Sequence, residues 1–197
     1  MIGQWQKLFS QLEVIDPGSE ICTREEIFLF EDRNGIVLPS GYKEYSQVFG
    51  TGLFGYGMHV YAPTSYLIEY SKETLESFRE TLVMFPSEDL QRDERLDSLF
   101  QSSLIFGDDS GAHVALWDLR TYGDDENYDI YWVDIDLIDE EYLIGRDFFE
   151  FISGFCLSKA SYDFLPIDKR PPLEQPQRFE SFTQPNSLEN FTQLNSL

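Results

Sequence analysis

The sequence predicts an α+β domain in which helices pack on a mixed, mainly antiparallel sheet. Three consecutive apolar segments between residues 104 and 137 are separated by short turns rich in Gly and Asp, and the last segment alternates apolar and polar side chains, a pattern typical of antiparallel strands. Other segments repeat apolar residues at helical spacing and begin at prolines or capping residues. The chain has 197 residues, with 17 Phe and 11 Tyr, and can therefore bury a large core.

The N-terminal part predicts two helices. Residues 2–13 have apolar side chains at positions i, i+3, i+4 and i+7, namely Trp5, Leu8, Phe9 and Leu12. Thr23 and Glu26 match a capping box, in which each side chain satisfies the backbone N–H of the other residue. The helix that begins there is expected to end near Gly35, because glycine tolerates the left-handed conformation of a helix C-cap.

Pro39 is expected to open a third helix, because its fixed φ suits the first turn and no partner for a backbone N–H is needed there. The aromatic residues of this helix share one face: Tyr42, Tyr45 and Phe49. Gly50 and Gly52 are predicted to end the helix, since glycine allows positive φ. We expect the aromatic face to pack on the sheet.

The middle of the chain predicts a strand and a long helix. Residues 53–62 alternate in the manner of a half-buried strand, and residues 64–85 form the helix. The apolar stripe of this helix consists of Leu67, Leu75, Phe78, Leu82 and Phe85. Residues 89–100 are polar and predict a helical or irregular surface segment.

Three strands are then expected at residues 104–106, 113–119 and 128–137, and their short connections predict an antiparallel meander. The middle strand divides its apolar side chains between two faces, with Val114 and Leu116 opposite Ala115 and Trp117. A last helix is predicted over residues 147–157, with Asp147 as its N-cap.

We predict that residues 1–165 form a single domain and that residues 166–197 form a disordered tail. Five prolines interrupt the tail and disfavour regular structure. Residues 182–188 (FTQPNSL) recur as residues 191–197 (FTQLNSL). Two copies are too few for a solenoid, so the repeat is either a slipped duplication or a pair of short docking peptides.

Acidic residues dominate the composition, and the formal net charge is −22. Residues 107–150 hold 14 acidic residues and only two basic ones, Arg120 and Arg146. Such a field repels nucleic acids and anionic membranes, which require a positive protein surface. It favours a basic protein partner. A general contribution to solubility is the alternative explanation for the overall charge.

The sequence shows no feature of an exported or membrane-spanning protein. Its first residues mix Gln, Lys and Ser with apolar side chains, and no run approaches the roughly 20 apolar residues that span a bilayer. We therefore expect a cytoplasmic protein. Cys22 and Cys156 lie outside any CxxC pattern, so we expect two buried thiols.

Patterns typical of catalysis or metal binding are weak. The turns at residues 107–111 and 123–126 gather carboxylates, which Ca²⁺ and Mg²⁺ prefer. Neither turn fits an EF-hand, and Asp and Gly are also ordinary turn residues. His59 and His113 lie in predicted strands with no nucleophile pattern beside them. We therefore expect neither a catalytic pair nor a metal site.

The glycine-rich residues 50–57 follow a helix and contain no Lys or Arg. A phosphate-binding loop normally follows a strand and needs a positive field, so we reject that interpretation. A mobile or tightly turning loop is the better prediction, with Phe54 and Tyr56 facing a partner.

The order of these motifs resembles the SUKH superfamily, which includes fungal cell-wall assembly regulators and bacterial immunity proteins of polymorphic toxin systems. The resemblance covers residues 21–157. Its motifs are Leu38-Pro39, Tyr42, Tyr45, Gly50-Thr51-Gly52, residues 106–111 (FGDDSG), Trp117-Asp118, Tyr131-Trp132-Val133 and residues 148–152 (FFEFI). The family often has an Asn-Gly pair where this chain has the glycine cluster, and the repeated tail is not part of the family pattern.

The resemblance implies an α+β fold without a shared active site, so we expect a non-enzymatic protein without cofactor or metal. It further implies binding and neutralisation of a cognate toxin, frequently a nuclease. A nuclease presents a basic groove for phosphate, which an acidic face would occupy. The predicted partner-binding residues are Phe54, Tyr56, Asp108, Asp109, Asp124, Asp125, Glu126, Asp134 and Asp136.

Two alternatives remain open. The first is a regulatory scaffold in the manner of the fungal members, which would use the Phe motifs of the tail. The second is a metal-dependent hydrolase at the carboxylate turns.

Overall fold

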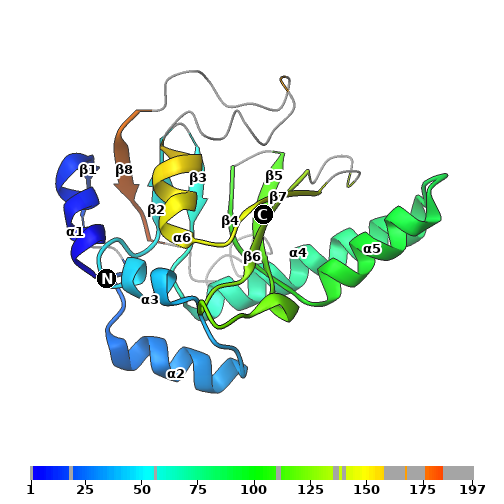
Figure 1. The fold of residues 1–197 in the computed structure, drawn as a ribbon, viewed down its shortest axis with the longest axis horizontal. Helices are drawn as coiled ribbons and strands as arrows, with labels where there is room; N and C mark the ends of the chain where they lie inside the picture. Colours follow the sequence, from blue (N-terminus) through cyan, green and yellow to red (C-terminus); the bar gives the residue numbers. More distant parts are fainter. Residues whose placement is uncertain are drawn as a thin grey trace, which may run out of the picture.

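The computed structural model describes residues 2–17, 20–55, 57–109, 112–134, 138, 141–157, 167 and 176–183. Eight strands form one sheet in the order β1-β8-β2-β3-β4-β5-β6-β7, and helices cover both of its faces (Figure 1). β1 and β8 pair in parallel, and the other neighbours are antiparallel. The predicted α+β class and the mixed, mainly antiparallel sheet are confirmed.

The helices and strands have the following bounds: α1 Ile2–Gln11, β1 Glu13–Ile15, α2 Arg24–Asn34, α3 Ser40–Ser46, β2 Gly52–Phe54, β3 Met58–Val60, α4 Ser65–Met84, α5 Leu90–Gln101, β4 Ser103–Asp108, β5 His113–Asp118, β6 Asp129–Asp134, β7 Glu141–Gly145, α6 Phe148–Glu150 and β8 Arg178–Ser181. A 3₁₀ turn follows β5 at Leu119–Thr121, and a π-helical segment continues α6 at Phe151–Cys156.

Helix α2 begins and ends as the sequence predicts. The Thr23 hydroxyl accepts a hydrogen bond from the Glu26 backbone N–H at 3.2 Å, and the Glu26 carboxylate accepts one from the Thr23 N–H at 2.7 Å. Gly35 closes the helix with φ of 63°. These bonds satisfy N–H groups that have no partner inside the helix.

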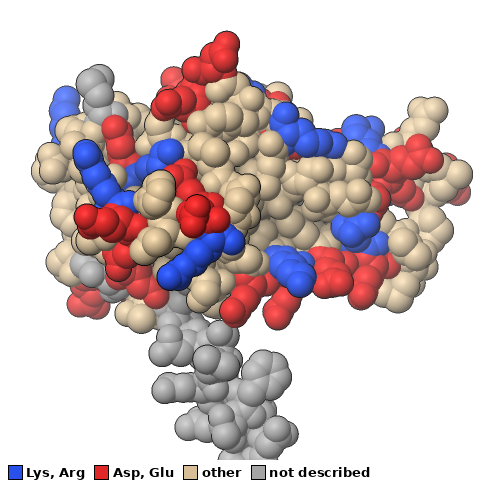
Figure 2. Space-filling model, turned by 90° about the horizontal axis from the view of Figure 1, so that it is seen from below, with Lys and Arg blue, Asp and Glu red and all other residues tan. Residues whose placement is uncertain are grey.

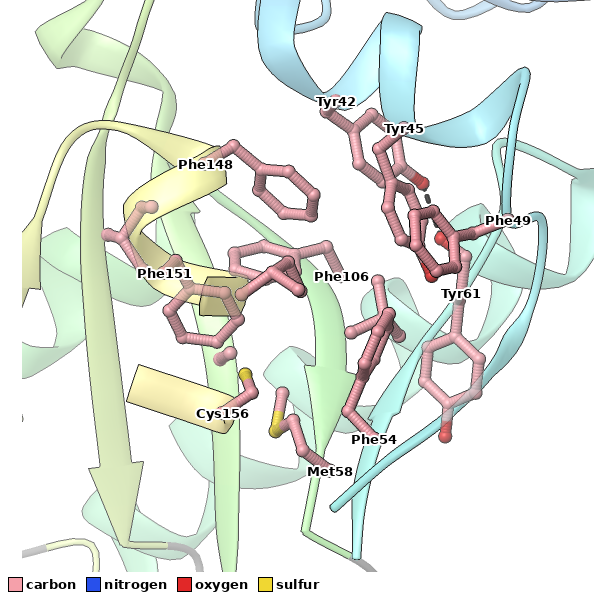
Figure 3. Packing of buried hydrophobic residues seen from close by; sticks show 14 of the residues in the cluster. Tyr42, Tyr45, Phe49, Phe54, Met58, Tyr61, Phe106, Phe148, Phe151 and Cys156 are labelled. Carbon is pink, nitrogen blue, oxygen red and sulfur yellow. Dashed lines mark hydrogen bonds between the residues drawn. The ribbon is translucent and has the colours of Figure 1, made fainter. Parts of the chain in front are cut away.

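The larger part of the core lies between the sheet and helices α1, α3 and α6 (Figure 3). The aromatic face of α3 and the residues after it is fully buried, with Tyr42, Tyr45 and Phe49 at 0% exposure. Edge-on ring contacts to Phe148 of α6 lie at centroid distances of 5.1 Å for Tyr42 and 5.3 Å for Tyr45. The Tyr42 hydroxyl donates to the Tyr61 carbonyl at 2.5 Å, so the one polar atom of that ring is also satisfied. The predicted packing of this face is confirmed.

The smaller part of the core lies on the opposite face of the sheet, under α4 and α5. Both helices contribute leucine and phenylalanine side chains: Leu75, Phe78, Leu82, Leu96, Leu99 and Phe100. In β5, Val114 and Leu116 belong to this cluster, whereas Ala115 and Trp117 belong to the larger one. The predicted division of the middle strand is therefore confirmed, and β5 is buried on both faces.

Several local predictions need correction. Residues 53–62 do not form one strand, because β2 and β3 pair as an antiparallel hairpin in which Phe54 lies opposite Met58. Phe85 does not belong to the buried stripe of α4, since its side chain is 75% exposed. For residues 89–100 the helical alternative is the one observed, because α5 covers Leu90–Gln101 with Asp89 as its N-cap.

Gly52 serves a different purpose from the one predicted. It begins β2 rather than ending α3 with positive φ, and a Cβ atom at this position would lie 2.1 Å from the Phe179 ring. Gly50, with φ of 73°, supplies the left-handed turn. Glycine is therefore required at residue 52 for close approach, because any side chain would displace β8.

β8 lies within the segment 166–197 that we predicted to be disordered, so that prediction was wrong for these four residues. β8 pairs with β1 on one side and β2 on the other, and Phe179 is fully buried. The predicted domain end near Leu165 therefore does not mark the end of the sheet. The second copy of the repeat, residues 191–197, lies outside the described residues.

Candidate functional site

The two acidic turns lie at opposite ends of the same strands. Asp108 and His113 flank the first turn, whereas Asp118 and Asp129, which pair across β5 and β6, flank the second. At about 3.3 Å per residue, β5 separates the two ends by roughly 17 Å. The two acidic turns therefore do not form one cluster, and each end is described separately.

At the first end, Asp108 is a buried hydrogen-bond acceptor with 8% exposure. Its carboxylate accepts hydrogen bonds from the hydroxyl groups of Tyr61 and, at 2.9 Å, Tyr70, and lies 3.0 Å from His59 Nδ1. Burial and the charge of Asp108 raise the pKa values of both tyrosines well above their usual range. The tyrosines are therefore neutral donors, and Asp108 holds β3, β4 and α4 together.

The neighbouring carboxylates at this end are also engaged inside the protein. Asp109 accepts the backbone N–H groups of Ala112 and His113, each at 2.9 Å, and lies 2.8 Å from His113 Nδ1. Burial opposes ionisation of Asp109, but these bonds outweigh it and hold its pKa below the usual value. Asp134 is 2% exposed and lies 3.8 Å from His113 Nε2.

We define the histidine end as His59, Asp108, Asp109, His113 and Asp134. The burial of Asp108 and Asp134, whose side chains are 12% and 2% exposed, corrects their prediction as partner-binding residues, because little of either carboxylate can reach a partner. The carboxylates of this end stabilise the turn and the strand ends.

At the second end, Arg146 organises an exposed loop, residues 123–127. Its guanidinium binds Asp125 through two bonds of 3.0 and 3.1 Å and also pairs with Asp129. It donates further hydrogen bonds to the carbonyl groups of Thr121 and Asn127, both at 2.9 Å. The hydrogen bonds from Arg146 lower the pKa of Asp125. One guanidinium therefore fixes the whole loop.

Asp124 and Glu126 remain exposed on this ordered loop, and no ion pair among the described residues involves either side chain. Two exposed apolar side chains lie nearby, Tyr122 at 40% and Val37 at 47%. The Tyr122 ring contacts Tyr128 at a centroid distance of 4.9 Å, and the Tyr128 hydroxyl donates to the Val37 carbonyl. We define the acidic loop end as Val37, Tyr122, Asp124, Asp125 and Glu126.

The sequence did not indicate the roles of Arg146, Tyr122 and Val37. A signal that would have identified Arg146 is its rarity, since residues 107–150 contain only one other basic residue, Arg120. Arg120 forms a two-bond pair with the buried Asp118, at 2.8 and 2.7 Å. Both arginines therefore neutralise aspartates that flank β5 and β6.

The remaining predicted site residues do not join either end. Phe54 has 0% exposure, so its prediction as a partner-facing residue was wrong. Its ring packs against Phe49 and Phe179 at centroid distances of 5.4 and 4.9 Å. Tyr56 and Asp136 lie outside the described residues.

Both cysteine thiols are free and buried, as predicted. Burial raises the pKa of the Cys22 thiol to about 12, and burial likewise raises the pKa of Cys156. Thiols of this kind are poor nucleophiles. In the described part of the chain, no group of three or more His, Cys, Asp or Glu side chains is placed to hold a metal ion. No helix in that part is both long and apolar enough to cross a membrane.

Comparison with known proteins identifies a family. Residues 21–154 match the sequence model of the SMI1 / KNR4 family (SUKH-1), and this match spans most of the chain. A search of curated proteins found no match.

Proposed function

The chain belongs to the SMI1 / KNR4 family (SUKH-1), and on that premise we propose that it is a non-enzymatic binding domain that neutralises a cognate protein toxin. The partner in this proposal is a basic protein such as a nuclease toxin, bound through acidic surface. The observation that carries the proposal is the ordered loop at residues 123–127, which presents Asp124 and Glu126 to solvent.

The charge of the whole molecule supports this choice of partner. A net charge of −22 attracts a basic protein over a distance and accelerates its association. A nuclease needs a basic groove that binds the phosphate groups of its substrate. The carboxylates of Asp124 and Glu126 carry the same negative charge as phosphate and would occupy such a groove. Because Arg146 already holds the loop in place, little conformational freedom is lost on binding.

The proposal is tested by searching the genes that flank this one for a toxin-like protein and co-expressing that protein with the chain. We expect a complex whose affinity falls as the salt concentration rises, and whose formation abolishes toxin activity. The absence of a complex, or a complex indifferent to salt, would contradict the proposal.

The loop itself is tested by the double substitution Asp124→Lys and Glu126→Lys. Asp125 is left intact because its pair with Arg146 maintains the loop. We expect weaker binding and a lower salt dependence, whereas the control Glu73→Lys, an exposed residue of α4, retains nearly the affinity of the unmodified protein. Equal affinities for all three proteins would contradict the role of the loop.

A regulatory scaffold is the second candidate, and the repeat in the tail favours it. Because β8 completes the sheet, a test by deletion must spare residues 178–183 and remove only residues 184–197. A scaffold that uses the tail would lose its partner on this truncation. A toxin-binding domain would keep its partner.

A further inference from the structure

The tip of the α4–α5 hairpin exposes four large apolar side chains. Val83 is 80% exposed, Met84 63%, Phe85 75% and Leu90 64%. They lie within eight consecutive residues, at the end of α4 and the beginning of α5. An exposed apolar cluster of this kind marks an interaction site more often than a single exposed side chain does.

The base of the same hairpin is buried, whereas its tip extends beyond the sheet. Leu75, Phe78 and Leu82 of α4 are buried against α5 and the sheet. α4 has 20 residues and is therefore about 30 Å long. Figure 1 shows that the hairpin continues past the strands and that its tip projects from the body of the protein. The fold therefore does not require apolar residues at the tip.

The charges around the tip are acidic. Four carboxylates near it are exposed: Glu80, Glu88, Asp89 and Glu94. The arginines of the hairpin are paired, Arg79 with Asp97 at 2.8 Å, Arg92 with Asp93 at 3.2 Å and Arg95 with Glu141. Figure 2 shows acidic and uncharged side chains at the outer end of the hairpin and basic side chains only further in.

A shallow groove between α4 and α5 adjoins the tip. Its volume is about 420 Å³, and its lining residues are Glu76, Arg79, Glu80, Val83, Met84 and Asp97. Val83 and Met84 therefore belong both to the tip and to the groove. The rest of the lining is charged, so the groove adds polar contact area to a tip whose four apolar side chains alone bury less than the roughly 800 Å² that each partner contributes to a standard interface.

We propose that this tip anchors an interface with a basic protein partner. Met84 and Phe85 insert into an apolar recess of the partner, and Lys and Arg side chains of the partner surround that recess. Met and aromatic side chains are enriched in the cores of interfaces, and a few such residues dominate affinity. The acidic rim selects a basic partner. A second copy of this chain would bring two acidic rims together, and an anionic membrane or nucleic acid would meet the same repulsion.

This inference rests on the proposed function, because its partner is the same basic toxin. The test uses the full chain and the toxin-like protein found by the search of the flanking genes, with affinity measured by titration calorimetry. The tip variant is Met84→Ser with Phe85→Ser. The matched control is Phe28→Ser in α2, a phenylalanine with a similar exposed fraction of 66%.

We expect the tip variant to bind at least about tenfold more weakly, and the control to bind as the unmodified chain does. Because the substituted side chains are exposed, the thermal midpoint of unfolding should change little. If the tip variant binds with the same affinity as the unmodified chain, the tip is not an anchor, and the proposed function is unaffected. Failure of the unmodified chain to bind would overturn both.

Two further measurements separate the competing occupants of the tip. If sedimentation shows a dimer that the tip variant loses, a second copy covers the tip and the proposal is overturned. If removal of residues 184–197 makes the tip accessible to a hydrophobic dye, the tail covers it and the proposal is again overturned. A monomer with equal dye binding before and after truncation supports the proposal.

Discussion

The histidine end and the acidic loop end carry similar numbers of carboxylates but use them in opposite ways. At the histidine end, Asp108 and Asp134 are almost completely buried and receive internal hydrogen bonds or approach a histidine. At the acidic loop end, Asp124 and Glu126 face solvent, while Arg146 fixes the loop beneath them. The carboxylates of the histidine end therefore stabilise the fold. Those of Asp124 and Glu126, at the acidic loop end, are exposed on the surface.

The largest expected effect is on stability at the histidine end. Asp108→Ala removes the acceptor for the buried hydroxyl of Tyr61 and the partly buried hydroxyl of Tyr70, and also removes the partner of His59. We expect the free energy of unfolding to fall by roughly 3 kcal/mol, because unsatisfied buried donors are costly. Denaturant titration measures this loss. Asp124→Ala, in the exposed loop, should cost less than about 0.5 kcal/mol, and equal losses would contradict the comparison.

A smaller effect is expected at Arg146. Arg146→Ala removes the hydrogen bonds that join Asp125, Asp129 and two backbone carbonyls. We expect a loss of about 1–2 kcal/mol in unfolding free energy, because several charge-assisted bonds are broken at a partly exposed site. Hydrogen exchange of residues 123–127 should accelerate. The control Arg79→Ala breaks one exposed pair, with Asp97, and should cost under about 1 kcal/mol without altering the loop.

The pH dependence of stability should differ between the native protein and an Asp109 variant. The pKa of Asp109 is lowered in the folded state, so folding favours its ionised form. The resulting stabilisation is present above the unfolded pKa of about 3.9 and is lost as the pH falls through the lower folded value. We expect the free energy of unfolding of the Asp109→Asn variant to decrease less steeply below about pH 4 than that of the unmodified protein. Parallel curves for the two proteins between pH 2 and pH 5 would contradict this.

The smallest expected effect is that of divalent cations. We expect no shift in the thermal midpoint with Mg²⁺, Ca²⁺ or Mn²⁺, because the carboxylates of the histidine end already bind protein donors. A specific ion at 100 times its dissociation constant would add about 2.7 kcal/mol. A saturable shift of that size would instead favour the metal-dependent hydrolase.

Much of the fold could be predicted because its signals are local. The capping box at Thr23, the aromatic face of α3 and the alternation in β5 each lie within a few residues of sequence. β1 and β8 could not be predicted in this way, since they have only three and four residues. Such short strands show little alternation, and their identity depends on pairing between residues 13–15 and 178–180.

The acidic composition of the site could be predicted, but its division into buried and exposed groups could not. The donors to Asp108 lie 38 and 47 residues away in sequence, and Arg146 lies 21 residues from Asp125. Only the pairing of strands brings these groups together. The apolar tip was missed for a related reason, because Phe85 continues the helical spacing of a stripe that is buried only up to Leu82.

The salt dependence of toxin binding tests the central claim most directly. The affinity of the unmodified chain for the toxin-like protein found among the flanking genes is measured between low and high salt, and again for Asp124→Lys with Glu126→Lys. We predict steep weakening with salt for the unmodified chain and a clearly shallower slope for the double variant. Identical slopes and affinities for the two proteins would contradict the claim that the acidic loop end binds the partner.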